Sequence, residues 1–176
     1  MAAVSTWTLL VQGKAFSAGG VMIGVLNGGT RVLRLRRVYM SNVQSAAVTG
    51  VAVFGRLIFR SATASWSSPT SVTPVAHDST NSALSSVTAG HAGTPSGGTA
   101  SDLRRYAWSS DEPAVSGATL DELECLYPLT CFWDAGYGDA NVQPLAIRQN
   151  EMVYILNDTG AAGLADFVME FTDEAS

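Results

Sequence analysis

The sequence predicts an all-β protein: an antiparallel β-sandwich of the jelly-roll type that carries a long excursion rich in Ser, Thr, Gly and Ala. Two observations lead to this fold class. Apolar runs with β-branched and aromatic residues recur along the chain between Gly, Asn and Asp, and they number about eight to ten. Helical periodicity is almost absent. A chain of 176 residues is long enough for a single domain, residues 1–176, with a substantial core.

The first sixty residues contain four predicted strands. An Asn27-Gly28-Gly29 turn follows the second and predicts a β-hairpin, because these residues readily adopt the backbone angles of tight turns. Leu and Arg alternate at the start of the third strand, and Arg37-Val38 interrupts the alternation as a bulge or a change of sheet would. Gly50 or Gly55 would suit a break in the fourth. The four runs are Thr6–Val11, Val21–Leu26, Arg31–Asn42 and Val48–Arg60.

Residues 61–101 differ from the rest of the chain in composition. Ser, Thr, Ala, Gly and Pro dominate, with only scattered apolar anchors such as Trp66. Because this composition buries little apolar area, we expect an extended loop excursion with one strand at Val72–Ala76. Loops of this length usually serve an interface, and a merely flexible insertion is the alternative. Residues 1–11 are expected to form an N-terminal arm.

The second half of the chain contains five further predicted strands. A helical turn is expected within Ser116–Cys125, where Thr119 would be its N-cap and acidic residues follow in the first turn. The segment Gln143–Leu156 predicts a hairpin closed by Gln149-Asn150. The five runs are Leu103–Ser109, Leu129–Trp133, Val142–Arg148, Glu151–Asn157 and Ala165–Thr172.

Charged residues are segregated along the sequence. Asp78 is the first acidic residue, and seven of the ten basic residues precede it. After Tyr106 the chain carries thirteen Asp and Glu against Arg148 alone, so the net charge of -5 conceals a separation of charge. The two ends must therefore pair with each other, with other copies of the chain, or with another surface. Charged residues make up only 14% of the chain, which indicates a surface that is largely neutral or covered.

Arg31, Arg34, Arg36 and Arg37 form the one basic cluster. They would pair with the acidic C-terminal third inside the sandwich, with acidic residues across a subunit boundary, or with nucleic acid. The pI of about 4.8, the single lysine and the lack of an aromatic platform argue against a nucleic-acid partner. The first two alternatives remain open.

The sequence contains no convincing catalytic or metal-binding constellation. His77 and His91 both lie in the excursion, where the rigid support that a catalytic base requires is not expected. Asp134–Asn141 lacks the ligand spacing of an EF-hand, and Asx turns explain its composition better than calcium binding does. We therefore expect no catalytic residue, no cofactor, no metal ion and no enzymatic activity.

Cys125 and Cys131 are the only cysteines, and their apolar neighbours favour two buried thiols over a disulfide. No run approaches the roughly 18 apolar residues that a membrane-spanning helix needs. Met1–Leu10 also lacks the basic and apolar regions of an export signal. A membrane is therefore not an expected partner.

Three stretches carry a resemblance to a known group of proteins. They are Ser45–Gly50 (SAAVTG), Trp108–Val115 (WSSDEPAV) and Trp133–Pro144 (WDAGYGDANVQP). In these stretches, and in the spacing of the strands around them, the chain resembles small structural proteins of tailed bacteriophages. Its glycine-rich, all-β style is similar to that of jelly-roll capsid decoration proteins, also called cement proteins.

The resemblance implies a non-enzymatic virion protein on the capsid exterior, assembled in the host cytoplasm. Such a protein stabilises an icosahedral shell by bridging neighbouring copies of the major capsid protein, often as a trimeric or dimeric homo-oligomer. Symmetric repetition multiplies contacts that are individually weak. The apolar candidates for the interface suit an ordinary core position equally well. The candidate interface residues are Trp7, Leu9, Leu10, Phe16, Arg31, Arg34, Arg36, Arg37 and Trp66.

The alternative is a head-fibre, tail or receptor-binding module of a phage particle. Jelly rolls often bind carbohydrate on their loops, and aromatic side chains would stack on the sugar rings. This alternative predicts exposed aromatic residues at one end of the sandwich, whereas a clamp predicts apolar residues along a face or an arm. The aromatic candidates are Trp66, Trp108, Trp133 and Tyr137.

Overall fold

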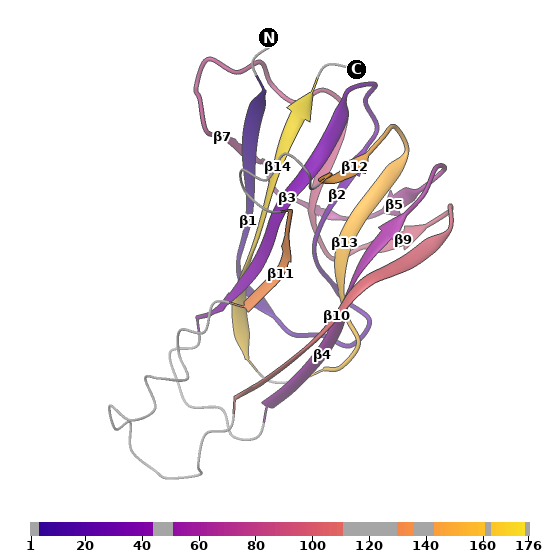
Figure 1. Ribbon diagram of the computed structural model, residues 1–176. Helices are drawn as coiled ribbons and strands as arrows, with labels where there is room; N and C mark the ends of the chain where they lie inside the picture. Colours follow the sequence, from indigo (N-terminus) through magenta and orange to yellow (C-terminus); the bar gives the residue numbers. More distant parts are fainter. Residues whose placement is uncertain (1–3, 44–50, 111–129, 136–142, 161–162, 175–176) are drawn as a thin grey trace.

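The computed structural model describes residues 4–43, 51–110, 130–135, 143–160 and 163–174, and strands are the regular elements of these ranges (Figure 1). The long strands are β1 (Ser5–Ala15), β2 (Val21–Asn27), β3 (Val32–Asn42), β4 (Val51–Arg60), β10 (Ala100–Ser110), β13 (Glu151–Asn157) and β14 (Leu164–Glu174). The short strands are β5 (Ser65–Ser67), β6 (Thr70–Ser71), β7 (Val75–Ala76), β8 (Val87–His91), β9 (Thr94–Ser96), β11 (Thr130–Asp134) and β12 (Leu145–Ile147).

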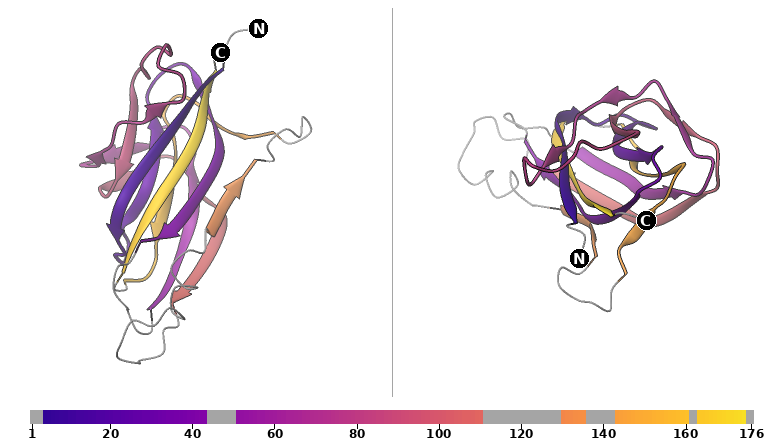
Figure 2. Two further views of the ribbon diagram at one scale, coloured as in Figure 1. Left: turned by 90° about the vertical axis from the view of Figure 1, so that its left-hand side faces the viewer. Right: turned by 90° about the horizontal axis from the view of Figure 1, so that it is seen from above.

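Two antiparallel sheets pack face to face. Sheet A has the order β11-β3-β14-β1-β7, and β12 also pairs with β3. Sheet B has the order β10-β4-β13-β2-β8-β6. The predicted all-β antiparallel sandwich is therefore confirmed, and its first and last long strands, β1 and β14, run side by side in sheet A (Figure 2).

The long strands change sheet as the chain advances. β1 and β3 lie in sheet A while β2 and β4 lie in sheet B, and near the C-terminus β13 lies in sheet B and β14 in sheet A. β14 is inserted between β1 and β3, and β13 between β2 and β4. This interleaved order is compatible with a jelly roll, in which two antiparallel sheets are wound together.

Both hairpins predicted from turn residues are wrong. β2 and β3 lie in different sheets, as do β12 and β13, so the chain crosses between sheets at each turn. The turn itself is present before β13, where Glu151 N donates to Arg148 O at 3.0 Å. Turn residues specify a reversal of the backbone, whereas the partner of each strand is decided by which apolar face the core buries.

A buried asparagine ties these two crossings together. Asn27 is 1% exposed, and its Nδ2 donates to the carbonyl oxygens of Arg31 at 2.7 Å and Ile147 at 2.8 Å. Its backbone carbonyl accepts from Asn150 N at 2.6 Å. Because a buried amide without partners would be costly, these bonds fix the geometry of both corners.

The interruption predicted in the third strand is a β-bulge. Glu170 lies opposite Arg37 and Phe171 opposite Leu35, so Arg36 is the extra residue. β4, by contrast, runs without a break through Gly55, which lies opposite Tyr106 of β10. A Cβ at Gly55 would lie 2.3 Å from Tyr106 Oη, so only glycine leaves room for this ring.

The main core fills the space between the sheets. Residues of every long strand contribute to it, including Leu9, Leu35, Leu57, Val153 and Phe167, all 0% exposed. Phe132 of β11 stacks on Phe167 and lies 4.2 Å from the Tyr106 ring between centroids. A single core therefore includes residues from the first long strand, β1, to the last, β14.

The excursion is built of short strands that wrap one side of the sandwich (Figure 2). β5 and β9 pair with each other, β6 and β8 extend sheet B beyond β2, and β7 extends sheet A beyond β1. The sequence predicted a single strand here, and β7 lies within that range. Local composition missed the other four because each depends on a partner strand that is distant in sequence.

Part of the excursion covers the outer face of sheet B. Along β13, Val153 and Ile155 belong to the main core, whereas Met152 and Tyr154 point to the opposite face. A second apolar cluster forms there, and Trp66 of β5 covers it. Its buried members are Val21, Ile58, Ala64, Trp66, Met152 and Tyr154.

Candidate functional site

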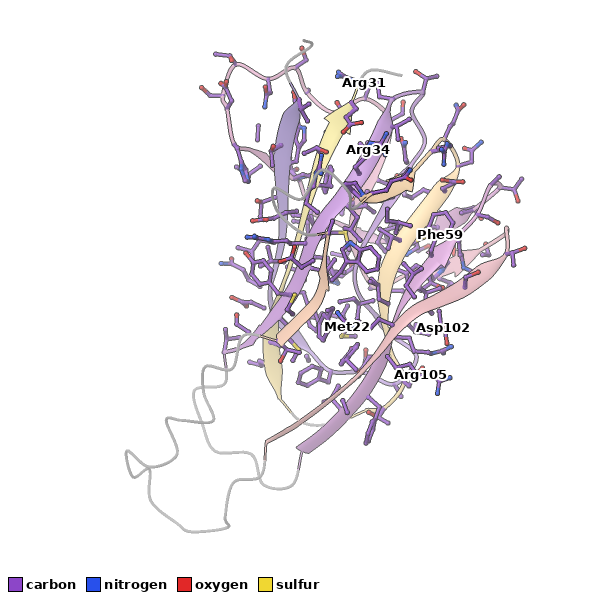
Figure 3. The ribbon with its side chains drawn as sticks, viewed as in Figure 1. Met22, Arg31, Arg34, Phe59, Asp102 and Arg105 are labelled. Carbon is purple, nitrogen blue, oxygen red and sulfur yellow. The ribbon has the colours of Figure 1, made fainter. Side chains whose placement is uncertain are left out.

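Arg31, just before β3, and Arg34 and Arg36 of β3 pair with acidic residues of β14 in the same chain. Arg31 Nε lies 2.9 Å from Asp173 Oδ1, and Arg36 Nη2 lies 3.5 Å from Glu174 Oε1. Arg34 pairs with the same Glu174 carboxylate. These contacts follow from the antiparallel register of β3 and β14, and Figure 3 shows Arg31 and Arg34 near one end of β3.

Arg37 completes the basic cluster by pairing with β11. Its Nε lies 3.4 Å from Asp134 Oδ2, across the pairing of β3 with β11. Of the two alternatives left open by the sequence, the structure therefore shows pairing within one chain. Asp134, the first residue of the turn-rich stretch considered for calcium, serves here as the partner of an arginine, and residues 136–141 of that stretch lie outside the described residues.

A second ion-pair network lies on sheet B. Arg56 of β4 contacts Asp158 at 2.8 Å and Asp102 of β10 at 3.3 Å, and Arg105 lies 3.7 Å from the same Asp102. The hydrogen bond to Asp158 is the main cause that raises the pKa of the Arg56 guanidinium. Figure 3 shows Asp102 and Arg105 on β10. The charges separated along the sequence thus meet in space on both sheets.

Asp173 is the most buried acid of the described chain, at 3% exposed. Burial raises the pKa of its carboxyl group, and the nearby Arg31 guanidinium lowers it by a smaller amount. The buried environment therefore disfavours the charged carboxylate, and the positive charge of Arg31 offsets part of this cost.

The outer face of sheet A carries a row of apolar residues across four strands. The register places Leu10 of β1 opposite Val168 of β14, Val168 opposite Tyr39 of β3, and Tyr39 opposite Cys131 of β11. We call these four residues the apolar band. Leu10 is 38% exposed and Cys131 is an exposed free thiol, whereas Val168 between them is 9% exposed. Tyr39 is half-buried, and this burial raises the pKa of its phenol.

Two further apolar residues extend the band toward one end of sheet A. Val43 is 38% exposed and Leu164 is 41% exposed, and Val43 N donates to Leu164 O at 3.2 Å. Both follow the outward alternation of their strands. The sequence did not single these positions out, because an apolar residue at the end of a strand looks the same whether it faces a core or solvent.

Most of the predicted apolar anchors are core residues of the single chain. Trp7 is 6%, Leu9 0% and Phe16 6% exposed, and all three belong to the main core. They have no apolar surface left for another subunit. Only Leu10 points outward, since successive residues of β1 alternate between the two faces of the sheet. Residues 5–11, expected to be an arm, form the first part of β1.

The structure describes the side chains of two of the four aromatic residues of the carbohydrate alternative, and neither is strongly exposed. Trp66 is 8% exposed, and its Nε1 donates to Ala92 O at 2.8 Å. Trp133 is half-buried and packs against the main core. The Trp108 side chain and Tyr137 lie outside the described residues. The one strongly exposed aromatic side chain in the described chain is Phe54 of β4, at 50%.

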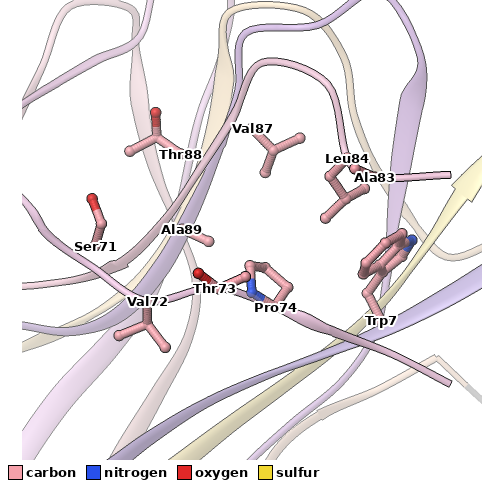
Figure 4. A pocket seen from close by; sticks show the side chains of 10 residues that line it. All are labelled: Trp7, Ser71, Val72, Thr73, Pro74, Ala83, Leu84, Val87, Thr88 and Ala89. Atoms are coloured by element: carbon pink, nitrogen blue, oxygen red, sulfur yellow. The ribbon is translucent and has the colours of Figure 1, made fainter. Parts of the chain in front are cut away.

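The described part of the sandwich includes two small hollows beside the features above. One of about 320 Å³ lies between the excursion and Trp7, with Val72, Pro74, Leu84 and Val87 among its lining residues and no charged group (Figure 4). The other, of about 370 Å³, lies beside Phe54 and the second ion-pair network. Both are near the lower limit of small-molecule pockets.

The histidines do not form a catalytic site within the described chain. His77 Nε2 lies 2.7 Å from Thr8 Oγ1 and its backbone N donates to Thr6 O, so His77 fastens the excursion to β1. Burial lowers the pKa of His91, and the nearby Lys14 lowers it further. No group of three His, Cys, Asp or Glu residues is arranged for a metal ion among the described residues.

The prediction of two buried thiols is wrong for Cys131. It lies on the outer face of β11, because its neighbour Phe132 takes the core position. Cys125 and the predicted helical turn lie outside the described residues. Within the described ranges no helix is long and apolar enough to cross a membrane.

No family model, curated protein or solved structure matches this chain. The functional argument therefore depends on the geometry of the chain itself.

Proposed function

We propose that this chain is a non-enzymatic structural protein of a tailed-phage virion, which decorates an icosahedral capsid and stabilises it by bridging neighbouring shell subunits. The observation that carries the proposal is that the first and last long strands pair with each other. β1 and β14 pair from Ser5–Asp173 to Ala15–Leu164, and the ion pairs of β3 with β14 reinforce the same sheet.

A clamp must keep its shape while the subunits that it bridges move. Antiparallel pairing along the length of β1 and β14 holds both strands inside sheet A through a ladder of hydrogen bonds. The excursion is fastened to both sheets through β7 and β8, and thus adds breadth without a mobile hinge. These properties suit a building block of an assembly better than a site of turnover.

The copy number of the chain in purified particles tests the proposal. Quantitative mass spectrometry of particles from the source would compare this chain with the major shell protein. A ratio near one copy per shell subunit, or a fixed simple fraction of it, supports a decoration protein that covers the lattice. A handful of copies per particle supports the fibre, tail or receptor-binding alternative instead, and complete absence overturns the virion role.

A second measurement separates the clamp from passive attachment. Particles stripped of this chain should lose their contents at a lower temperature than complete particles, and adding the purified chain back should restore the difference. Equal release temperatures would contradict the stabilising role even at a high copy number.

A further inference from the structure

The outer face of sheet B carries an exposed aromatic ring beside a hollow. Phe54 of β4 is 50% exposed, although aromatic side chains usually bury most of their area. Its register partner on β10 is Ala107, whose small side chain covers little of the ring. The hollow, of about 370 Å³, is lined by both residues and has room for one small ligand.

The position of Phe54 is fixed by its backbone. Phe54 N donates to Thr159 Oγ1 at 2.9 Å, and Phe54 O accepts from Asp158 N at 2.7 Å. The preceding residue, Val53, is a core residue that is 0% exposed, so alternation along the strand directs the Phe54 ring outward. The exposed ring therefore lies on a rigid part of the sheet, which favours precise binding.

A hydrogen-bond donor and an acceptor border the same hollow. The Arg105 side chain is 80% exposed, and its ion pair with Asp102 is 3.7 Å long, so N–H groups of this guanidinium are open to a ligand. Three hydrogen bonds from Arg56, at 2.8 Å, 3.0 Å and 3.0 Å, orient the Asp158 carboxylate. A carboxylate has about four acceptor positions, so Asp158 still has one for a ligand.

The charges around the hollow compensate one another. Two arginines and two aspartates form the ion-pair network, namely Arg56, Arg105, Asp102 and Asp158. A charged ligand would be attracted by one pair of groups and repelled by the other. A hydroxyl group, by contrast, can accept from the guanidinium and donate to the carboxylate. The site therefore favours an uncharged ligand that has several hydroxyl groups and one apolar face.

We propose that the hollow beside Phe54 is a binding site for one uncharged sugar ring. One face of such a ring carries mainly C–H groups, which suit the face of Phe54, and the hydroxyl groups at its edge suit Arg105 and Asp158. Phe54 is not one of the four aromatic residues that the sequence offered for carbohydrate binding. The inference goes beyond the proposed structural role and does not depend on it.

Saturation-transfer NMR with the full chain tests the site. The probes are the methyl glycosides of glucose, galactose, mannose and N-acetylglucosamine at millimolar concentration, with cyclohexanol as an apolar control and methyl glucuronide as a charged one. At least one uncharged glycoside should bind more tightly than either control, and the C–H groups on one face of its ring should receive the strongest transfer.

Variants of the exposed side chains locate the binding. Phe54→Ala should raise the dissociation constant about tenfold or more, whereas Phe54→Trp keeps an aromatic face and should retain binding. Arg105→Met removes the donors but keeps most of the side-chain length, and it should also weaken binding. Leu10→Ala, at an exposed apolar residue of sheet A, is the matched control and should leave the constant unchanged.

Four results would overturn the inference. They are no transfer to any uncharged glycoside, equal binding of cyclohexanol, binding of the glucuronide alone, and a dissociation constant that Phe54→Ala leaves unchanged or that Leu10→Ala raises as much. Cyclohexanol binding would mean that the hollow recognises apolar area only, and glucuronide binding would mean an anion site at Arg105. None of these results changes the copy number in particles, so the proposed virion role stands or falls separately.

Discussion

At the residue scale, Gly55 shows how the partner across a strand pair restricts which residue a position can hold. The Tyr106 ring occupies the space that a side chain at Gly55 would need, with Oη 2.3 Å and Cζ 2.4 Å from the position of a Cβ. The ring also packs against Phe132, which limits its ability to move away. An aromatic ring over a glycine of the neighbouring strand is a recognised way to stabilise a sheet position that lacks a side chain.

We therefore expect Gly55→Ala to lower the free energy of unfolding by about 1–3 kcal/mol, the usual cost of overpacking a core. Urea unfolding followed by fluorescence would measure the change. Gly160→Ala is the control, because its added Cβ would meet its nearest atom at an ordinary 3.5 Å. Equal stability of the two variants would contradict the steric argument.

Asp173 predicts a specific dependence of stability on pH. Burial raises the pKa of the folded carboxyl above its unfolded value, so the folded state binds more protons between the two pKa values. The stability linked to this proton is complete below the unfolded pKa of about 3.9 and is lost as pH rises through the folded pKa.

The wild-type free energy of unfolding should therefore fall relative to that of Asp173→Asn as pH rises through this window. Urea unfolding of both proteins at a series of pH values would measure the difference. A constant offset added to this trend would reflect the lost contact with Arg31 and is compatible with the argument. A difference between the two proteins that stays constant, or grows in favour of the wild type, as pH rises would contradict it.

Single residues also show how much of the structure the sequence predicts. Alternation along β1 predicts that Trp7 and Leu9 share a face and that Leu10 lies on the other, and the structure agrees. Alternation does not say which face meets the chain's own core. That choice depends on β14, whose residues pair with β1 from more than 140 positions away in sequence.

The two-stranded sheet of β5 and β9 is attached to the sandwich through Trp66. Trp66 covers the second apolar cluster, and its indole hydrogen bond to Ala92 O joins β5 to the segment between β8 and β9. Gly93 lies so close to this indole that an added Cβ would be 2.9 Å from Nε1. The excursion contains few apolar residues, so each of them has a large effect on its stability.

Trp66→Ala should lower the free energy of unfolding by about 3 kcal/mol, at the lower end for the loss of a buried aromatic residue. The loss should be local. Hydrogen exchange measured by mass spectrometry should accelerate in β5 and β9 while β1 and β14 stay protected. Thr94→Ala, at an exposed side chain of the paired strand β9, is the control and should change neither quantity appreciably. Uniform acceleration across sheets A and B would contradict the separate attachment of the β5–β9 sheet.

Turn residues gave the positions of reversals but not the partners of the strands. Asn27-Gly28-Gly29 and Gln149-Asn150 mark real corners, yet each corner leads to the opposite sheet. The difference lies in long-range contacts such as Asn27 Nδ2 with Ile147 O, which join two corners that are 120 positions apart. A local pattern contains no information about such a contact.

At the scale of the whole molecule, the segregation of charge in the sequence is resolved by folding. The sequence predicted that the two ends must find partners, and the register of β3 with β14 and β11 supplies them. The choice between pairing within the chain and pairing across a subunit boundary depends on which strands are neighbours. Composition alone does not predict which strands are neighbours.

Arg34→Glu combined with Arg36→Glu should therefore weaken folding. Exposed ion pairs contribute about 0.2–1 kcal/mol each, and the new like-charge contacts with Glu174 add to the loss, so we expect a decrease of about 1–3 kcal/mol. Thermal unfolding at low and high salt would measure it, and salt should reduce the difference. Adding Glu174→Arg should restore part of the stability. An unchanged melting temperature with altered oligomeric mass would contradict pairing within the chain.

The position of β14 between β1 and β3 also has a consequence for biosynthesis. A ribosome delivers β1 and β3 long before β14, so these two strands wait for the strand that separates them until residues 164–174 have been made. Sheet A therefore forms only once β14 is available, in a step that closes long loops and is correspondingly slow. A chain that is truncated before Leu164 should leave the nascent polypeptide with two unjoined sheet edges, which are natural sites for chaperone binding.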